Sequence, residues 1–423
     1  MENSAPAQTS TGLLHSSALA PLQEPLFRTL WIAAVISYTG SWMQNIATGW
    51  LMTSLTGSPM WVSLVQVALS LPVLLIALPA GALADIMDRR KFLLFTQTSM
   101  VGASVILGVL TITGTCTPTL LLIFTFLLGT GAVMNDPAWQ ALTPDLVPVS
   151  KLPAAVALNS AGFNIARAVG PALGGLVIAA AGSGVAFLLN GLSFFGVILF
   201  LYRWNPQSQP AAQHSHQAPP TVRSAVMLGI RYAGQESRIR AVLVRTAAFS
   251  LFASSFWALL PLIASKFGAQ GYGTMLAFFG LGALAGALLL VRARRSFSYD
   301  GVAVAATVVF AAALCGLVRA TTLTGSSIFA AAAGLAWISI LATLNLVAQT
   351  SCPPWVRARV LSMYVLVLQG GLALGSVLWG AVASHVGVKS SLTAAAVAMV
   401  IFLLLANWYR LQESQHSLKR QES

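Results

Sequence analysis

The chain has 423 residues, of which 57% are hydrophobic and only 8% are charged, and its mean hydropathy is +0.80. This composition excludes a soluble globular protein, which needs far more charge to cover its surface. The net charge of +13 does not indicate nucleic-acid binding, because the basic residues are scattered among short loops.

The apolar runs recur along the chain, and each can cross a hydrocarbon core of roughly 30 Å as a helix of about 20 residues. They lack the alternation of barrel strands, so helices are the expected spanning elements. We predict an all-α membrane protein with twelve transmembrane helices in two six-helix bundles. The predicted spans are approximately 27–53, 60–84, 92–114, 118–140, 154–181, 184–203, 242–265, 271–291, 301–318, 325–349, 359–385 and 388–409.

Residues 1–26 are rich in Ser, Ala, Pro and Gln and carry only acidic charge. They contain no basic start followed by a short apolar core. We therefore expect a flexible cytoplasmic tail and no cleaved signal peptide. The predicted N-terminal bundle, residues 27–203, follows this tail.

The first predicted span carries a polar face. Tyr38, Ser41, Asn45 and Thr48 recur at intervals of three and four residues, which puts them on one side of a helix. Such a face contacts either substrate in a cavity or polar groups of other helices, where each hydrogen bond stabilises by about 1 kcal/mol. The candidate substrate-cavity residues of the whole chain are Tyr38, Ser41, Asn45, Gln66, Asn164, Trp257, Asn345 and Gln369.

The clearest motif runs from Gly81 to Lys91 and reads Gly-Ala-Leu-Ala-Asp-Ile-Met-Asp-Arg-Arg-Lys. It resembles the loop signature of the major facilitator superfamily, although Ile86 and Asp88 replace a basic residue and a glycine of that signature. The alternative is that the basic residues only fix the topology. The resemblance implies a conformational latch between the halves, formed by Gly81, Asp85, Arg89, Arg90 and Asp136.

Asp136 stands near the inner end of the fourth span. An acid inside a span is a functional candidate by default, so it could carry a proton. We favour the other interpretation, that it extends the Asp85–Arg89 network, because superfamily latches often include an acid on this helix. Many drug exporters of the superfamily also have an arginine in this helix where Thr125 stands here, which argues against identical proton coupling.

The fifth span contains Gly170-Pro-Ala-Leu-Gly-Gly175, preceded by Asn164 and Arg167. Glycines allow close helix packing, and Pro171 leaves the carbonyl of Arg167 without its usual donor, which favours a bend. The alternative is packing alone. The run resembles the antiporter signature of superfamily exporters, with Arg167, Gly170, Pro171, Gly174 and Gly175 as its motif residues.

Arg167 is the most informative single residue of this span. About 14 helical residues precede it, so it lies roughly 21 Å from the inner end, past the middle of the membrane. A charge there costs at least about 3 kcal/mol unless it faces a cavity or a partner. We weigh equally a contact with substrate anions and a contact with carbonyl groups that stiffens the helix.

The longest polar interruption, 204–241, is the predicted cytoplasmic linker. His214 and His216 lie in its flexible first part, where we expect them to be exposed rather than to bind a metal. From 223 on, Arg and apolar residues recur at near-helical spacing, which predicts an amphipathic helix on the inner membrane surface. A C-terminal bundle, 242–409, and a cytoplasmic tail, 410–423, complete the predicted organisation.

An internal repeat relates the two predicted bundles. An offset of 205 residues aligns Gly170 with Gly375 and Gly175 with Gly380, without gaps. Duplicated helical halves are the usual architecture of carriers that rock around a central site.

Lys and Arg are distributed unequally over the predicted loops. Only Lys266, Arg319 and Lys389 fall on the outer side, Arg167 lies within a span, and the others of the 23 lie on the inner side. Basic residues mark the cytoplasmic side. We therefore expect a multi-pass protein of the bacterial cell inner membrane with both termini in the cytoplasm.

Two further stretches resemble one branch of the superfamily. Asn135-Asp-Pro-Ala-Trp-Gln140 and the Asn-x-x-Arg-x-x-Gly-Pro of residues 164–171 are similar to the bacterial group of the enterobactin exporter and macrolide efflux proteins, the transmembrane secretion effectors. The resemblance implies a secondary active transporter of a small amphipathic or aromatic molecule, with proton-coupled export of a drug-like or siderophore-like molecule by alternating access. The alternative is an uptake carrier for a specific nutrient or vitamin.

Trp42, Trp257 and Trp337 either stack on an aromatic substrate or pack against neighbouring helices. Catalysis is not expected, because the sequence shows no nucleophile–base pair, metal cluster or phosphate-binding loop. The cysteines at 116, 315 and 352 lie in separate segments, which indicates neither disulfides nor a metal site. We expect no cofactor, and a monomer whose partners are the small-molecule substrate, protons and membrane lipids but no nucleic acid.

Overall fold

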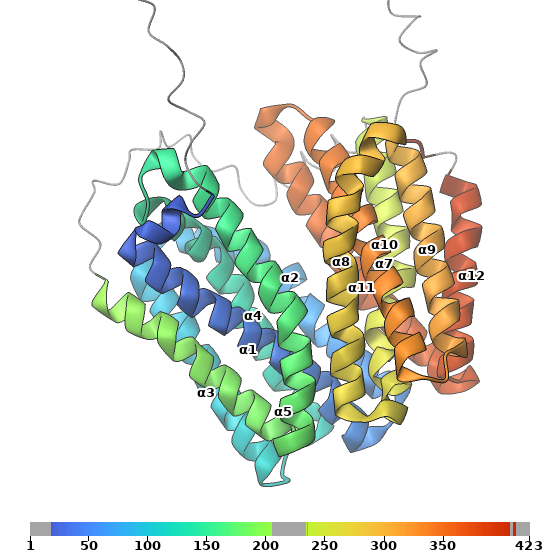
Figure 1. Ribbon diagram of the computed structural model, residues 1–423, viewed down its shortest axis with the longest axis horizontal. Helices are drawn as coiled ribbons and strands as arrows, with labels where there is room; N and C mark the ends of the chain where they lie inside the picture. Colours follow the sequence, from blue (N-terminus) through green and yellow to red (C-terminus); the bar gives the residue numbers. More distant parts are fainter. Residues whose placement is uncertain (1–17, 205–233, 235, 407–408, 412–423) are drawn as a thin grey trace, which may run out of the picture.

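The computed structural model describes residues 18–204, 234, 236–406 and 409–411, and all regular structure in these ranges is helical (Figure 1). The predicted all-α class is confirmed. Short 3₁₀ turns connect several helices. The helices are α1 (Pro25–Thr56), α2 (Pro59–Ile86), α3 (Arg89–Ile112), α4 (Pro118–Leu142), α5 (Leu152–Arg203), α7 (Ser237–Ala264), α8 (Gly268–Ser296), α9 (Tyr299–Arg319), α10 (Leu323–Thr350), α11 (Pro354–Val386) and α12 (Val388–Ala406).

Each predicted span falls on one of these helices, with ends shifted by no more than about five residues. The fifth and sixth spans share α5, whose backbone breaks at Gly182 with φ 84° and ψ 166°. A glycine tolerates this positive φ because it has no Cβ. His214, His216 and the first part of the predicted amphipathic helix, which was expected from Arg223 to Arg245, lie outside the described residues. The last part of that segment, from Ser237 on, forms the start of α7.

Among the described residues, eight stretches are long and apolar enough to cross a membrane. Two of them are unusually long, Val149–Arg203 with 55 residues and Ser237–Ser296 with 60. Gly182 interrupts the first, and Gly268, with φ 72°, interrupts the second. Each long stretch therefore consists of two helical arms.

Local sequence signals explain where the helices begin. Ser298 and Thr322 accept hydrogen bonds from backbone amides in the first turns of α9 and α10. Asp88, which replaces a glycine of the loop signature, caps α3 by accepting from the amide of Lys91 at 2.9 Å. Several other helices begin at or next to a proline, whose missing amide costs nothing in the first turn.

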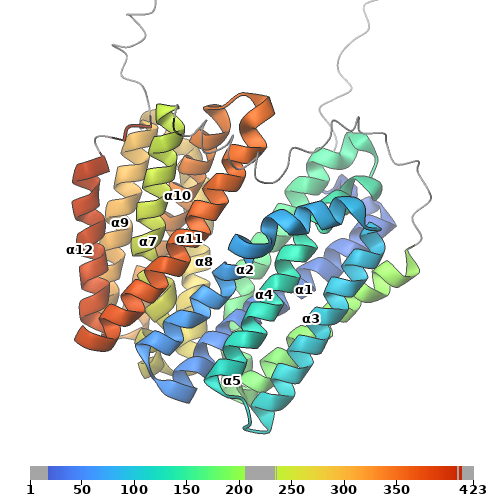
Figure 2. The same cartoon turned by 180° about the vertical axis from the view of Figure 1, so that it is seen from behind.

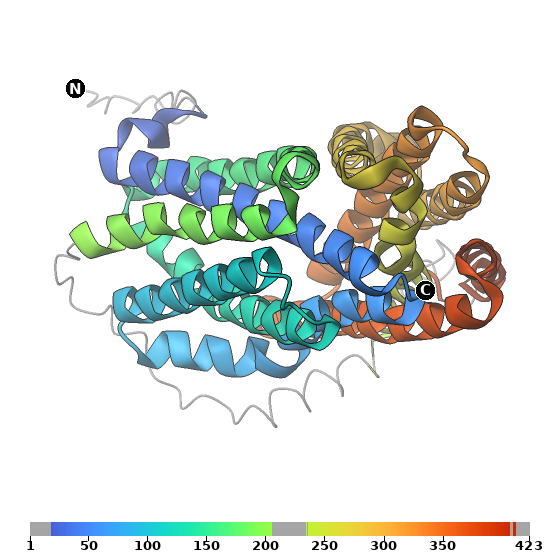
Figure 3. The ribbon, with the colours of Figure 1, turned by 90° about the horizontal axis from the view of Figure 1, so that it is seen from below.

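The helices gather in two bundles, α1 to α5 and α7 to α12 (Figures 1 and 2). The bundles meet along two helix pairs, α5 with α8 and α2 with α11. In Figure 1 the ribbons diverge toward the top, where α7 begins. Seen from below, in Figure 3, the two bundles lie side by side.

Small residues bring the helices into backbone contact. Gly170 and Gly174 face α1, where a methyl group at Gly174 would lie 3.0 Å from the Cα of Met43. Gly175 faces the other bundle, and a methyl group there would lie 2.9 Å from the Ala269 carbonyl oxygen and the Gly273 Cα. Gly174 thus packs within its own bundle, whereas the next residue, Gly175, packs between the bundles.

The predicted repeat has a structural counterpart in α11. Gly375 packs against α7 at Leu251, as Gly170 packs against α1. Gly380 packs against Ser63 of α2, as Gly175 packs against α8. The two halves therefore contact each other through equivalent glycines at the same end of the molecule.

The chain after α12 is attached to the second bundle by a buried ion pair. Arg245 of α7, only 7% exposed, binds Asp300 at 2.6 Å and donates to the carbonyl oxygen of Tyr409 at 2.8 Å. The amide of Leu411 donates to the Asp300 carboxylate at 3.1 Å. These contacts hold residues 409–411 against the starts of α7 and α9.

The Gly175 contact predicts the effect of a single methyl group. Gly175→Ala should lower the thermal midpoint of the detergent-purified protein, because backbone of α8 stands where the methyl group must go. Gly102→Ala in α3 is the matched control, since nothing lies within 4 Å of that position and alanine favours a helix. The midpoints are measured by size-exclusion chromatography after heating. Equal midpoints for the two variants would contradict the close packing.

Candidate functional site

A cavity of about 600 Å³ lies between the two bundles. Its walls come from α1 to α5 on one side and from α7, α8, α10 and α11 on the other. This volume is in the range of pockets that bind small molecules. The glycine contacts of α5 with α8 and of α11 with α2 lie at one end of the helices that enclose the cavity.

Most of the polar residues that were predicted to face substrate line this cavity. From the first helix, Ser41 and Thr48 join Tyr38 and Asn45, so the predicted polar face does point inward. Trp42 and Trp337 also belong to the lining. The lining residues from the original candidate set are Tyr38, Ser41, Asn45, Gln66, Trp257 and Gln369.

Two candidates lie elsewhere, which corrects the prediction. Asn164 is exposed on α5 and donates to the carbonyl oxygen of Ser160 in its own helix at 2.8 Å. Asn345 accepts a hydrogen bond from Gln349, one turn along α10. Neither belongs to the described cavity lining. Both amides bind within their own helix, a possibility that helical spacing alone does not exclude.

One acid and one base stand among the described lining residues, Asp136 and Arg167. Asp136 is exposed because it faces the cavity, and it acts electrostatically on the Tyr38 hydroxyl group. The guanidinium group of Arg167 lies 5.6 Å from the ring centre of Trp42 and 5.7 Å from that of Phe279. Within the described part of the chain, neither charge forms an ion pair.

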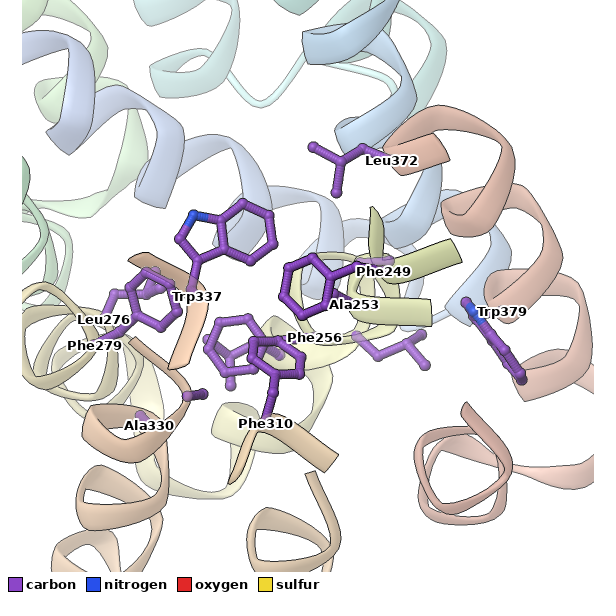
Figure 4. Close-up of a cluster of buried hydrophobic side chains, with 14 of the residues drawn as sticks. Phe249, Ala253, Phe256, Leu276, Phe279, Phe310, Ala330, Trp337, Leu372 and Trp379 are labelled. Atoms are coloured by element: carbon purple, nitrogen blue, oxygen red, sulfur yellow. The ribbon is translucent and has the colours of Figure 1, made fainter. Parts of the chain in front are cut away.

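Aromatic side chains form two walls around these charges. In the first bundle, Phe163 meets Tyr38 and Trp42 edge to face, with ring centres 5.5 and 6.2 Å apart. In the second bundle, six rings form an aromatic cluster centred on Trp337, much of which Figure 4 shows. The members of the aromatic cluster are Phe249, Phe256, Trp257, Phe279, Phe310 and Trp337.

The predicted latch residues are only partly described. Arg89 approaches Asp145 of the α4–α5 connection at 3.6 Å and donates to the carbonyl oxygen of Ala141, in the last turn of α4, at 3.3 Å. Arg90 donates to the Leu201 and Tyr202 carbonyl oxygens at the end of α5, each at 2.7 Å. Gly81 and Asp85 lie in the last turns of α2, and their surroundings are outside the description. These arginine contacts stay within the first bundle.

Asp136 stands apart from these arginines. The structure places it in the cavity wall beside Tyr38, whereas Arg89 lies beside Asp145 in the loop after α4. The sequence interpretation that we favoured joined Asp136 to Arg89. The difference arises because Pro137 and the following turns carry α4 on to Leu142, so Arg89 meets the residues that follow Asp136.

The helix 5 motif acts through packing in this structure. A methyl group at Gly273 of α8 would lie 2.6 Å from the carbonyl oxygen of Pro171. A methyl group at Gly280 would lie 3.3 Å from the carbonyl oxygen of Arg167, the one that Pro171 deprives of a donor. Within α5, the residue with non-helical backbone angles is Gly182 rather than Pro171. The proline therefore lies within a helical segment that contacts α8.

Buried amides that the sequence interpretation missed link the helices of the first bundle. Gln44 of α1 accepts hydrogen bonds from Asn190 of α5 at 2.5 Å and from Ser104 of α3 at 3.0 Å. Gln97 of α3 donates to Asn135 of α4 at 3.1 Å. Gln44 directly precedes Asn45 in an apolar helix. Two adjacent polar residues there were the sequence signal that could have indicated a buried hydrogen bond at Gln44.

Among the described residues, no three His, Cys, Asp or Glu side chains group together as metal ligands would. The free cysteines Cys116, Cys315 and Cys352 are buried or half-buried. The site therefore offers hydrogen bonds, two opposite charges and aromatic faces. This is the chemistry of binding an amphipathic molecule.

Comparison with known proteins adds two kinds of similarity. A family model described as transmembrane secretion effector matches residues 16–422. The staphyloferrin A transporter of Staphylococcus aureus is 22% identical over 396 residues, which cover 91% of this chain and 98% of that protein. The multidrug efflux pump Tap of Mycolicibacterium fortuitum is 24% identical over 382 residues, covering 88% and 93%. Macrolide efflux protein A of Streptococcus pyogenes is 26% identical over 151 residues, covering 36% and 37%.

Solved structures show the same fold at lower identity. The inward-facing, occupied form of a bacterial homologue of the human lysosomal transporter Spinster has a TM-score of 0.71 and 14% identity, over 93% of this chain and 99% of that one. The nucleoside transporter NupG has a TM-score of 0.67 and 15% identity, over 91% and 100%. These structures share the arrangement of helices with this chain.

The Gln44 contacts predict a loss of stability that a second change should partly reverse. Gln44→Met should lower the thermal midpoint, because the buried Asn190 amide loses its acceptor. Adding Asn190→Leu removes that unpaired donor and should recover part of the loss. Gln66→Met is the control, since Gln66 donates only to Ser70 of its own helix. Additive losses in the double variant would count against this network.

Proposed function

Since the chain belongs to the transmembrane secretion effector family of major facilitator transporters, we propose that it exports a small amphipathic or aromatic molecule by proton-coupled alternating access. The cavity between the bundles carries this proposal. It combines amide groups, two opposite charges and aromatic walls, and both bundles contribute to it. A binding site shared by two halves can be exposed to either side when the halves rock about it.

The contacts between the halves support an inward-open state. The α5–α8 and α2–α11 contacts through Gly175 and Gly380 lie at the end opposite Arg203 and Ser237. The distribution of Lys and Arg puts the other end, which carries Arg203, Ser237 and the connecting residues 204–241, in the cytoplasm. The cavity then faces the cytoplasm. The solved structure of the bacterial Spinster homologue is likewise described as inward-facing. An exporter collects its substrate in this state.

We propose twelve membrane crossings with both termini in the cytoplasm of the inner membrane. A helix of 55 or 60 residues is roughly 80 to 90 Å long, so each of the two longest apolar stretches holds two crossings. α1 and α12 each add one to the eight stretches. The proposed domains are the bundles 27–203 and 242–409, joined by the cytoplasmic linker 204–241.

Asp136 is the proposed proton carrier. It faces the cavity, and no described residue binds its carboxylate with a hydrogen bond or ion pair. A carboxylate among membrane helices without a cationic partner favours its protonated form, and water in an open cavity returns it to the charged form. The Asp85–Arg89 latch between the halves is a separate proposal, which rests on the resemblance of residues 81–91 to the superfamily loop signature.

The cargo class follows from the relatives and from the lining. The names of the relatives concern a siderophore, staphyloferrin A, and the drugs of multidrug and macrolide efflux pumps. These relatives are transporters, which supports transport rather than catalysis as the proposed function of this chain. Amides and indole rings in one cavity bind molecules with both polar and aromatic parts.

Reconstituted vesicles test the proposed function. Purified protein in proteoliposomes should move fluorescent or radiolabelled drug-like and siderophore-like molecules when a pH gradient is imposed, and protein-free vesicles should not. Cells without the gene should accumulate the same molecules. Depletion of a nutrient from those cells instead would support uptake, and the absence of flux across a broad library would refute transport.

Asp136→Asn should separate substrate movement from proton coupling. The variant cannot bind or release the proton, so it should still exchange substrate between the two sides but should not accumulate it when a pH gradient is applied. Glu24→Gln, which weakens an ion pair with Lys151 outside the described cavity lining, is the control and should keep gradient-driven flux. Gradient-driven accumulation at the wild-type rate by Asp136→Asn would remove this acid from the coupling mechanism.

A further inference from the structure

Two buried hydrogen-bond donors in the cavity wall have no acceptor among the described residues. They are Nε of Arg167 in α5 and Nε1 of the Trp257 indole in α7. Both side chains line the cavity. A buried donor without an acceptor costs roughly 1–3 kcal/mol, and more when the group is charged. Both atoms are closed to solvent in this structure, so a ligand reaches them only after neighbouring side chains shift.

The side chains of Arg167 and Trp257 both contact the ring of Phe279. The Arg167 guanidinium group lies 5.7 Å from the ring centre of Phe279, and the Trp257 ring centre lies 4.9 Å from it. Trp42 covers the guanidinium group from the first bundle at 5.6 Å. Cation–π contacts of this kind hold the guanidinium plane in place without using its N–H groups. No described residue accepts a hydrogen bond from the Nε–H group.

The internal alternatives for Arg167 do not account for these donors. The sequence left open that Arg167 binds backbone carbonyl groups, but the described residues provide no such hydrogen bond. Asp136 stands beside Tyr38, one helical turn and about 6 Å along α1 from Trp42. The described residues place no ion pair between the two charges. The cavity thus presents its acid and its base as separate contacts.

We propose that Arg167 and the Trp257 indole N–H form an anion subsite that binds the carboxylate of an aromatic or amphipathic substrate. The guanidinium group supplies a planar set of donors that matches a carboxylate, and the indole N–H adds a donor from the opposite bundle. Trp337, whose ring centre lies 5.5 Å from that of Trp257, continues the wall on which the body of the substrate stacks. This inference rests on the proposed transport function and names its substrate class.

The subsite joins the two halves of the molecule. Arg167 and Trp42 belong to the first bundle, whereas Trp257 and Phe279 belong to the second. A carboxylate bound between them contacts both halves at once. A neutral molecule of the same shape keeps the stacking and loses the charge-assisted hydrogen bonds. The subsite therefore predicts a preference for the acid over its neutral amide.

Equilibrium dialysis with a matched pair of probes tests this subsite. Naphthalene-2-carboxylate and naphthalene-2-carboxamide share a ring system and differ in charge. Wild-type protein in detergent should bind the carboxylate at least about tenfold more tightly than the carboxamide. Arg167→Gln should remove this preference and leave the carboxamide affinity within about twofold, whereas Arg167→Lys should keep part of the preference because it keeps the charge.

Trp257→Phe provides the second variant, because it keeps an aromatic ring and removes the indole N–H together with the five-membered ring. It should weaken carboxylate binding about three- to tenfold and weaken carboxamide binding less. Arg319→Gln is the control, since Arg319 is exposed at the end of α9 and outside the described cavity lining. This control should bind both probes as the wild type does.

The outcomes separate the subsite from the transport function. An unchanged preference in both Arg167→Gln and Trp257→Phe overturns the subsite, as does a wild type that binds no carboxylate up to about 1 mM. Drug flux that persists in those variants leaves transport standing. Conversely, a wild type that binds the carboxylate as expected but moves no molecule of the library refutes transport and leaves the subsite intact.

Discussion

Backbone contact between α5 and α8 is the constraint on which the rest of the molecule depends. At Gly175 and Gly273 the two helices approach so closely that a single added methyl group would touch backbone atoms of the partner. The equivalent contact, Gly380 against Ser63, brings α11 to α2. Together these contacts join the bundles at one end of their helices, and the bundles diverge toward the other. The cavity lies between them because small residues bring the halves together at one end only.

The charges in the cavity follow from this geometry. Lipid would penalise Asp136 and Arg167 heavily, but a space between the bundles lets both face polar groups or water. Buried amides such as Gln44 and Asn190 hold the helices of the first bundle together and also border the cavity. The polar residues of the lining therefore divide into those that bind other helices and those, such as Asp136 and Arg167, with no described ion pair or hydrogen bond to another side chain. The second group determines what the cavity can bind.

Much of the fold was predictable because long apolar runs and Gly-Pro positions report directly on helices and their close contacts. The positions of Tyr38, Ser41 and Asn45 were predictable for the same reason, since helical spacing places them on one face. Spacing cannot show which neighbour a side chain meets. Asn345 binds Gln349 within its own helix, and Arg89 meets Asp145 rather than Asp136. Such pairings depend on how helices far apart in sequence rotate against one another, which one sequence does not record.

The cavity lining is unequal between the bundles, and this has a consequence for how such a protein can evolve. The acid, the base and most of the amides come from the first half, while the second half contributes mainly indole and aliphatic surface. Substitutions at Trp257, Leu276 or Trp337 would reshape the space offered to a cargo without touching the charged groups. Selection for a new compound can therefore proceed in one gene segment while the other keeps the energy-converting parts. Recombination between related genes near the linker would exchange this indole and aliphatic surface as a unit and keep Asp136 and Arg167.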